Sequence, residues 1–312
     1  MRDLVVKAGV ALGILALVGT VAGTVGEAWW IFDLASNFRL QYFIAAGIAA
    51  IVTFAARLPL LGIAFGVVSL FNAALVAPLY ASEPPPVAGD ARMEIASSNM
   101  QTHNSRQQIN WLTSTEPDLI FLFESSRQAE DLIREADLGY EVTSGIDPDD
   151  AFGLSILSKD PFEFEVLPSS RDGGDAVRLE ARLGNETIVV YAIHPPSPSN
   201  PVRSESRDKL LERIGRAAAE ETLPVVVVGD FNATPWSAGF RKLVEPADLA
   251  NSQDGFGFGA TWHANWPAFA GVPLDHLVHS RDLTTVNREV GPSAGPDHRP
   301  IRVELGFAEI DA

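Results

Sequence analysis

The chain has 312 residues, of which 46% are hydrophobic and 20% charged, so its composition excludes a disordered or collagen-like protein. The formal net charge is −17, and all of it lies beyond residue 89, where 19 basic residues face 36 acidic ones. Such an acidic segment is poorly suited to clamp a nucleic-acid backbone, because tight binding there draws on many Lys and Arg contacts. The absence of cysteine excludes disulfides, zinc-thiolate sites and thiol catalysis, although it does not identify the compartment.

Apolar segments dominate residues 1–81 and predict a membrane region with three spans, at about 8–26, 40–56 and 60–80. The first has 19 residues without a charge, enough to cross roughly 30 Å of hydrocarbon. A cleaved signal peptide is one alternative, because basic residues precede the first segment, and buried helices of a soluble protein are another. Three nearly uncharged segments in succession favour the membrane interpretation.

Three spans would place the two ends of the chain on opposite sides of the membrane. The positive-inside rule puts Arg2, Lys7 and Arg57 on the cytoplasmic side, against Arg39 alone on the other. We therefore expect a multi-pass protein of the cell membrane whose C-terminal domain is extracytoplasmic. A stiff Pro-rich linker is expected over 82–91, followed by a folded domain over 92–306 and a tail over 307–312.

Strand-like and helix-like stretches alternate beyond the linker. Expected strands are 93–98, 118–123, 152–157, 177–182, 187–193, 224–229, 274–279 and 301–305, and expected helices are 104–115, 126–136, 203–221 and 237–243. The four valines of 225–228 are typical of a strand buried between two layers. The hairpin-like segment 177–193 argues against a doubly wound parallel sheet. We expect an α/β domain with two packed sheets and helices outside.

Polar residues follow several of the apolar strands. Asp230 and Asn232 come directly after the valine strand, where a carboxylate and an amide two residues apart can orient a water and bind a charged transition state. The same residue types are ordinary turn formers. Glu124 ends the strand 118–123, either as a helix N-terminal acid or as a hard oxygen ligand for Mg²⁺. Asn99 follows the first expected strand and would supply an amide oxygen.

Histidines stand at three further strand ends. His194 precedes two prolines, which exclude a helix there, and a lone loop histidine can equally be an exposed surface residue. Asp275-His276 opens one strand, and Asp297-His298 precedes the last one. A carboxylate from one pair could fix the tautomer of an imidazole from the other and raise its basicity.

In order and spacing, these residues resemble the endonuclease/exonuclease/phosphatase superfamily, which has the fold of deoxyribonuclease I. The resemblance covers about 92–306 and is strongest at Gly229-Asp230-Phe231-Asn232 and at Gly295 to Pro300. Phe123 stands where the family often has Gln, and Pro296 where it often has Ser. Neither departure removes a catalytic atom, so both concern the choice of substrate rather than the activity itself. The layout with an apolar N-terminal region resembles membrane-anchored bacterial members.

The resemblance implies a four-layer sandwich of two packed mixed β-sheets flanked by helices, and a divalent metal ion. Glu124 would bind the ion, with Asn99 and Asp297 near it. Because these ligands are oxygen donors, the site would suit Mg²⁺ or Mn²⁺ better than Zn²⁺.

The resemblance also implies roles in the hydrolysis of a phosphoric ester. Asp230 would align or deprotonate the attacking water, and Asn232 would hold a non-bridging oxygen. His298, oriented by Asp275, would polarise a phosphoryl oxygen or assist proton transfer. His194 would donate a hydrogen bond to the phosphate.

Three functions remain open from the sequence. The first is a membrane-anchored phosphodiesterase or phosphatase acting on a lipid head group or a small phosphoester. The second is an endonuclease or exonuclease acting on DNA or RNA, for which a patch of Arg203, Arg207, Lys209 and Arg213 could contact one strand, unless these residues merely form a solvated helix face. The third is an inactive binding domain that retains the fold. No protein partner can be inferred.

Overall fold

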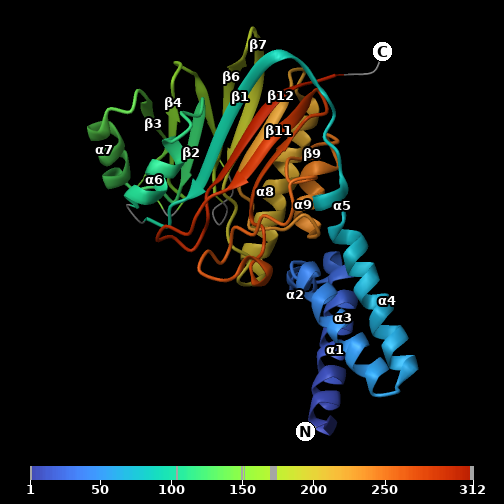
Figure 1. The fold of residues 1–312 in the computed structure, drawn as a ribbon. Helices are drawn as coiled ribbons and strands as arrows, with labels where there is room; N and C mark the ends of the chain where they lie inside the picture. Colours follow the sequence, from blue (N-terminus) through green and yellow to red (C-terminus); the bar gives the residue numbers. More distant parts are fainter. Residues whose placement is uncertain (1, 103–104, 149, 151, 169–173, 310–312) are drawn as a thin grey trace.

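The computed structural model describes the whole chain apart from residues 1, 103–104, 149, 151, 169–173 and 310–312. It consists of a bundle of helices attached to a larger α/β domain (Figure 1). The bundle contains α1 (Arg2–Thr24), η1 (Gly26–Ala28), α2 (Trp30–Ser36), α3 (Arg39–Ala55), α4 (Pro59–Val76) and α5 (Pro78–Ala81). Helices α1 and α4 are each long and apolar enough to cross a membrane, and α2 with α3, bent by 69°, could form a third span.

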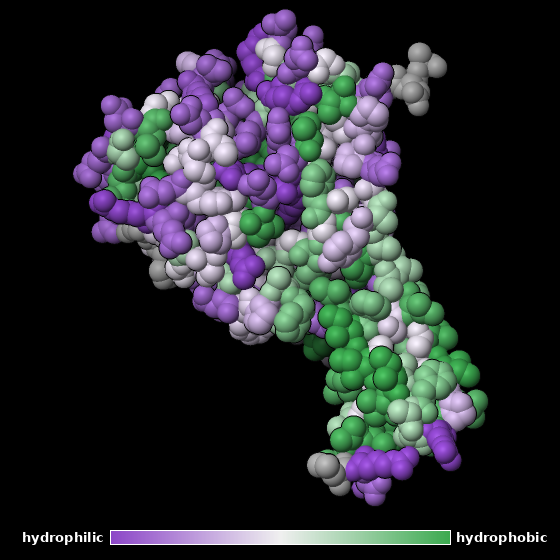
Figure 2. Space-filling view, in the orientation of Figure 1, coloured by the Kyte–Doolittle hydropathy of each residue, from purple (hydrophilic) through white to green (hydrophobic). Residues whose placement is uncertain are grey.

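Small residues let the long helices of the bundle approach closely. A Cβ added at Gly9 of α1 would lie 2.7 Å from Cγ1 of Val52 in α3. The buried Asn72 of α4 donates a hydrogen bond from Nδ2 to Thr20 Oγ1 at 2.8 Å. Large apolar side chains point outward instead, and they cover the bundle in an apolar surface that contrasts with the polar α/β domain (Figure 2). An exposed surface of this extent is typical of a membrane contact.

The α/β domain contains two six-stranded sheets. The strands are β1 (Val87–Asn99), β2 (Leu119–Phe123), β3 (Glu141–Ile146), β4 (Leu154–Ser158), β5 (Phe164–Leu167), β6 (Ala176–Leu183), β7 (Glu186–Ile193), β8 (Val225–Asp230), β9 (Ala250–Asn251), β10 (Asp275–His279), β11 (Leu283–Val290) and β12 (Ile301–Ala308). Their order is β11-β12-β1-β2-β4-β3 in one sheet and β5-β6-β7-β8-β10-β9 in the other. The pairs β1–β2 and β7–β8 are parallel and the other pairs antiparallel, so both sheets are mixed.

The sheets pack face to face with helices outside, which gives the expected four layers. The central core lies between the sheets, with Phe121 from one and Val228 from the other among its buried side chains. Helices α6 (Arg106–Thr113) and α7 (Arg127–Ala136) cover one outer face. Helices α8 (Pro201–Glu220) and α9 (Ala238–Val244) cover the other, while the short η2 (Ala268–Ala270) lies in a loop.

Several elements differ from the sequence expectations at their ends. Strand β1 already begins at Val87, within the expected linker, because its first residues pair with Phe307 and Ala308 of β12. The expected tail thus contributes residues to a strand, while 310–312 lie outside the described residues. Residue 104, where the first helix of the domain was expected to begin, lies outside them as well. The expectations missed β3, β5, β9 and β11, which are the four edge strands of the two sheets.

Candidate active site

The register of the strands brings the predicted site residues to one edge of the two sheets. Asn99, the last residue of β1, pairs with Phe123, so Glu124 follows directly beside it. In the second sheet Ile193 pairs with Gly229, which places His194 next to Asp230. On the other side of β8, Asp275 pairs with Asp230.

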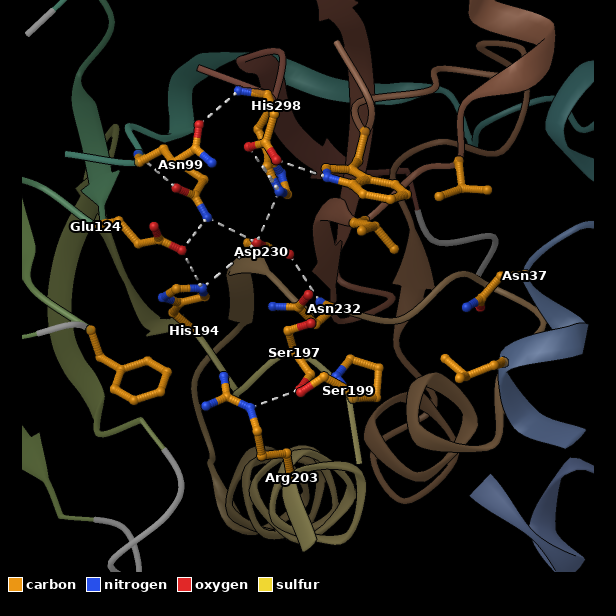
Figure 3. A pocket seen from close by; sticks show the side chains of 18 of the residues that line it. Asn37, Asn99, Glu124, His194, Ser197, Ser199, Arg203, Asp230, Asn232 and His298 are labelled. Carbon is orange, nitrogen blue, oxygen red and sulfur yellow. Dashed lines mark hydrogen bonds and ion pairs between the residues drawn. The ribbon is translucent and has the colours of Figure 1, made fainter. Parts of the chain in front are cut away.

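These side chains surround a pocket of about 590 Å³ (Figure 3). Seven of the eight predicted site residues line it: Asn99, Glu124, His194, Asp230, Asn232, Asp297 and His298. The eighth, Asp275, is fully buried behind the imidazole of His298.

The imidazole of His298 lies between the carboxylates of Asp275, Asp230 and Asp297. Its Nδ1 lies 2.8 Å from Asp275 Oδ2, and its Nε2 lies 3.6 Å from Asp230 Oδ2. Burial alone would lower the pKa of His298, but Asp275 and Asp230 outweigh it and raise this pKa to about 10. The ring is therefore an imidazolium at neutral pH, with both nitrogens protonated.

Asp230 is buried at the centre of the site. Its Oδ1 accepts a hydrogen bond from the backbone N–H of Asn232 at 2.9 Å, and its Oδ2 accepts one from Asn99 Nδ2 at 3.0 Å. Burial raises the pKa of Asp230 above its usual value, although His298 opposes this shift. A carboxylate with a raised pKa is a stronger base toward a bound water.

Asn232 adopts a left-handed backbone conformation (φ 50°), in which its N–H turns back to Asp230. Its side-chain Nδ2 donates to the carbonyl of Pro195 at 3.1 Å. Its own carbonyl accepts a hydrogen bond from Arg207 Nη1 at 3.1 Å. The loop after β8 is thus held from two sides.

Glu124 and Asp297 stand at the open side of the site, with side chains 28% and 27% exposed. Asn99 Nδ2 donates to Glu124 Oε1 at 2.9 Å as well as to Asp230, while its Oδ1 accepts from the N–H of Gln101. In this orientation the amide nitrogen, rather than the expected oxygen, faces the carboxylates. Asp297 Oδ2 accepts from the indole Nε1 of Trp262 at 3.1 Å.

His194 is buried beside the same carboxylates. Its Nε2 lies 3.5 Å from Glu124 Oε1 and 3.6 Å from Asp230 Oδ2. Burial lowers the pKa of His194, against the opposing effect of Asp230. His194 is therefore neutral and can donate from one nitrogen.

A divalent cation fits the chemistry of this site. Three carboxylates, Glu124, Asp230 and Asp297, line the pocket and Asp275 lies behind His298, whereas the positive charges at the pocket are those of His298 and Arg203. Asp230, Asp275 and His298 bring ligand atoms within 4.8 Å of one another, but Asp275 is paired with the imidazolium of His298, so the carboxylates left for an ion are Glu124, Asp297 and Asp230. Among the residues that the structure describes, the buried Asp275 Oδ1 has no hydrogen-bond partner. The donors are mainly oxygens, the ligands that Mg²⁺ and Mn²⁺ prefer.

The helix α8 does not present a basic patch. Arg207 is fully buried and pairs with Asp33 of α2 at 2.5 Å and with Asp208 at 2.7 Å, so neither a strand-binding patch nor a solvated face describes it. Lys209 pairs with Glu205 along the helix. Arg213 donates to the backbone carbonyls of Leu167, the last residue of β5, and of Pro168. Of the four residues, Arg203 alone lines the pocket.

Sequence reasoning missed one wall of the pocket. Leu34 of α2, together with Asn37 and Phe38 just after it, faces the site from the helical bundle (Figure 3 shows Asn37 across the pocket from Glu124). A possible signal was Asp33, one of few charges in an apolar region. Trp262, which binds Asp297, was also missed.

The two-sheet sandwich with this cluster at its edge defines a hydrolase of phosphoric esters with the deoxyribonuclease I-like fold. Residues 96–303 match the Endonuclease/Exonuclease/phosphatase family, and the chain belongs to it. No curated protein matches the chain.

Solved structures share the fold at low sequence identity. TDP2 from D. rerio, complexed with a single-strand DNA product, is 16% identical over 70% of this chain and 100% of its own, with a TM-score of 0.57. TDP2 from Caenorhabditis elegans is 17% identical over 86% of this chain and 93% of its own, with a TM-score of 0.57. An endonuclease/exonuclease/phosphatase from Beutenbergia cavernae is 17% identical over 70% of this chain and 72% of its own, with a TM-score of 0.53.

Proposed function

We propose that the protein is a membrane-anchored, Mg²⁺- or Mn²⁺-dependent hydrolase that cleaves a phosphodiester or phosphomonoester by direct attack of water. The observation that carries the proposal is the arrangement of Asp230 and Asn232 opposite the His298–Asp275 pair, with Glu124 and Asp297 at the open side of the pocket. Phosphoryl transfer requires positioning and charge stabilisation, and no covalent intermediate is needed.

Glu124 and Asp297 are the side chains that would hold the ion. Charged His298 has no free lone pair for a metal, and Asp275 is engaged with it. Asn99 stays close to the ion in this proposal and orients Glu124 through its amide nitrogen. When bound, Mg²⁺ or Mn²⁺ supplies neutralisation of the phosphoryl oxygens.

The remaining residues act on the water and the phosphate. Asp230 takes a proton from the attacking water, whose oxygen bonds to phosphorus as the bond to the leaving oxygen breaks. The leaving oxygen keeps the bonding electrons and takes up a proton from solvent water. The imidazolium of His298 stabilises the negative charge that grows on a phosphoryl oxygen. Asn232 and His194 donate hydrogen bonds to the other oxygens.

Nuclease activity is the second candidate, because TDP2 from D. rerio shares the fold and was crystallised with a DNA product. The burial of Arg207 and the acidity of the domain argue against it, since single strands are bound along positively charged grooves. An inactive domain is disfavoured because all eight site residues are in place around the pocket.

Chelation tests the proposed function. The full chain, purified in detergent, should hydrolyse bis(p-nitrophenyl) phosphate or p-nitrophenyl phosphate. EDTA should abolish the rate, and added Mg²⁺ or Mn²⁺ should restore it. A rate that persists in EDTA, or no hydrolysis of either ester with added metal, would contradict the proposal.

A further inference from the structure

The pocket has two chemically different halves. The half described above is polar, whereas the side toward the helical bundle is lined by apolar side chains from distant parts of the chain: Leu34, Phe38, Val272 and Leu274. Hydrolysis of a phosphate group alone requires no such surface. The apolar side of the pocket is therefore suited to bind a second, apolar part of the substrate.

The wall formed by the helical bundle is firmly attached to the catalytic domain. Asp33 Oδ1 accepts from the N–H of Ala238 at 2.6 Å, in addition to the buried ion pair between Asp33 Oδ2 and Arg207. Asn37 Oδ1 accepts from Thr234 Oγ1 at 2.9 Å. Thr234 and Ala238 lie in the segment that follows Asp230, and Arg207 holds the carbonyl of Asn232 in that segment, so the wall has a fixed position relative to the polar half.

The wall lies at the level where the spans end. Helix α1 ends at Thr24 and α3 begins at Arg39, so α2 lies between them at the end of the bundle that faces the catalytic domain (Figure 1). Gln41, in the first turn of α3, donates to the carbonyls of Phe269 and Gly271. The loop after β9 therefore lies level with the beginning of that span.

Exposed aromatic side chains gather at this level. Phe269 is 62% and Trp266 48% exposed on the loop beside α3, and Trp29 and Phe38 are exposed at the two ends of α2. Aromatic residues are enriched where a membrane protein meets the bilayer interface. The mouth of the pocket thus lies beside the bilayer surface.

We propose that the substrate is a phosphoester lipid of the bilayer, with its phosphate at Asp230 and His298 and the beginning of its acyl chains along the wall of Leu34 and Phe38. The placement of the phosphate rests on the proposed function. The placement of the chains rests on the apolar half and on its position at the ends of the spans.

Photolabelling tests this inference without hydrolysis as its readout. The full-length His298→Ala variant, which would spare the probe, is placed with Mg²⁺ in dodecyl maltoside micelles, which contain no phosphate. The probe is phosphatidylglycerol with a diazirine on one acyl chain. We expect labelling of peptides that contain Leu34 to Phe38 and Val272 to Leu274.

Competitors identify which part of the lipid is recognised. Dioleoyl phosphatidylglycerol should suppress the labelling, whereas equal concentrations of glycerophosphoglycerol, which lacks chains, or dioleoylglycerol, which lacks phosphate, should not. Adding Leu34→Gln and Phe38→Gln should lower labelling about tenfold or more, because two apolar contacts are lost. Ile31→Gln is the matched control, since Ile31 is exposed on the same helix and does not line the pocket.

The outcomes separate this inference from the proposed function. No labelling of these peptides, equal competition by glycerophosphoglycerol, or equal losses in the two sets of variants would overturn the inference, even if soluble phosphoesters are hydrolysed. Labelling that depends on both chains and phosphate would support it. If the wild-type chain then hydrolysed no phosphoester, the proposed function would fail while the lipid site remained.

Discussion

Asp275 and His298 come from different strands' ends and meet through a 2.8 Å contact, which makes their cooperation directly testable. We expect His298→Ala to lower kcat on bis(p-nitrophenyl) phosphate by about 10²–10⁴-fold, the loss typical of a positioned acid–base or oxyanion group. Asp275→Asn should lower it less, because the imidazole stays but loses its orienting carboxylate. The double variant should be no worse than His298→Ala alone; losses that multiply would show that the two residues act independently.

His276 provides a test of stability against pH. The ring is fully buried, donates from Nε2 to the carbonyls of Ala233 or Pro273, and packs on Phe231. Burial lowers its pKa to about 3. Below about pH 6.5 the unfolded chain therefore binds a proton that the folded chain does not, so stability falls as the pH falls from about 6.5 toward 3.

At pH 5 this difference should cost about 2 kcal/mol relative to neutral pH. The thermal midpoint, followed by tryptophan fluorescence in detergent, should thus drop by about 4–8 °C more between pH 7.5 and 5 in the wild type than in His276→Gln. The glutamine can keep a donor but cannot titrate. Identical drops in both proteins would show that His276 is not responsible.

Not every property of a residue could be predicted from the sequence. Asp230 and Glu124 were predicted as site residues because each directly follows an apolar strand, and both line the pocket. The burial of Arg207 could not be predicted from the sequence, because its partner Asp33 lies 174 residues away in the helical bundle. The amide orientation of Asn99 depends likewise on contacts with two strands of different sheets.

At the scale of elements, α2 is the link between the bundle and the active site. Asp33→Ala would leave Asp208 as the one carboxylate among the described residues that pairs with the buried Arg207, and breaking such a buried pair typically costs about 3–5 kcal/mol. Because Arg207 also holds the carbonyl of Asn232, activity should fall as well. Hydrogen exchange at the N–H of Ala238, which binds Asp33, should accelerate.

Glu27→Gln is the matched control for this change. It removes the ion pair with Arg241, which joins the same two regions but is exposed, so its cost should stay below about 1 kcal/mol. Equal effects of the two substitutions would mean that α2 is not anchored by the buried pair.

Among the elements, those with a buried apolar pattern were predicted and those without it were missed. The valines of β8 are buried on both faces, and the pattern found them. In contrast, β3 and β5 are edge strands with only one fully buried residue between them, so neither shows a clear apolar alternation. That α2 contributes to a wall of the pocket could not be predicted from the sequence, because it depends on tertiary contacts between the bundle and the catalytic domain.

For the whole molecule, the division of basic residues along the bundle predicts its orientation. Arg2 and Lys7 lie near the turn between α3 and α4, at the end of the bundle far from the catalytic domain (Figure 1). The positive-inside rule then places that end in the cytoplasm and the catalytic domain outside. Alkaline phosphatase fused after residue 312 should be active and a fluorescent protein dark; the reverse pattern would contradict this orientation.

The central claim is that Glu124 holds a metal ion for hydrolysis of a phosphoester in this pocket. The most direct measurement is the Mg²⁺ dependence of bis(p-nitrophenyl) phosphate hydrolysis by the full chain in detergent, for wild type, Glu124→Gln and His298→Ala. We predict that Glu124→Gln raises the Mg²⁺ concentration for half-maximal rate by about tenfold or more, because one anionic ligand is lost. His298→Ala should lower the maximal rate and shift that concentration far less. An unchanged Mg²⁺ requirement in Glu124→Gln would contradict the account.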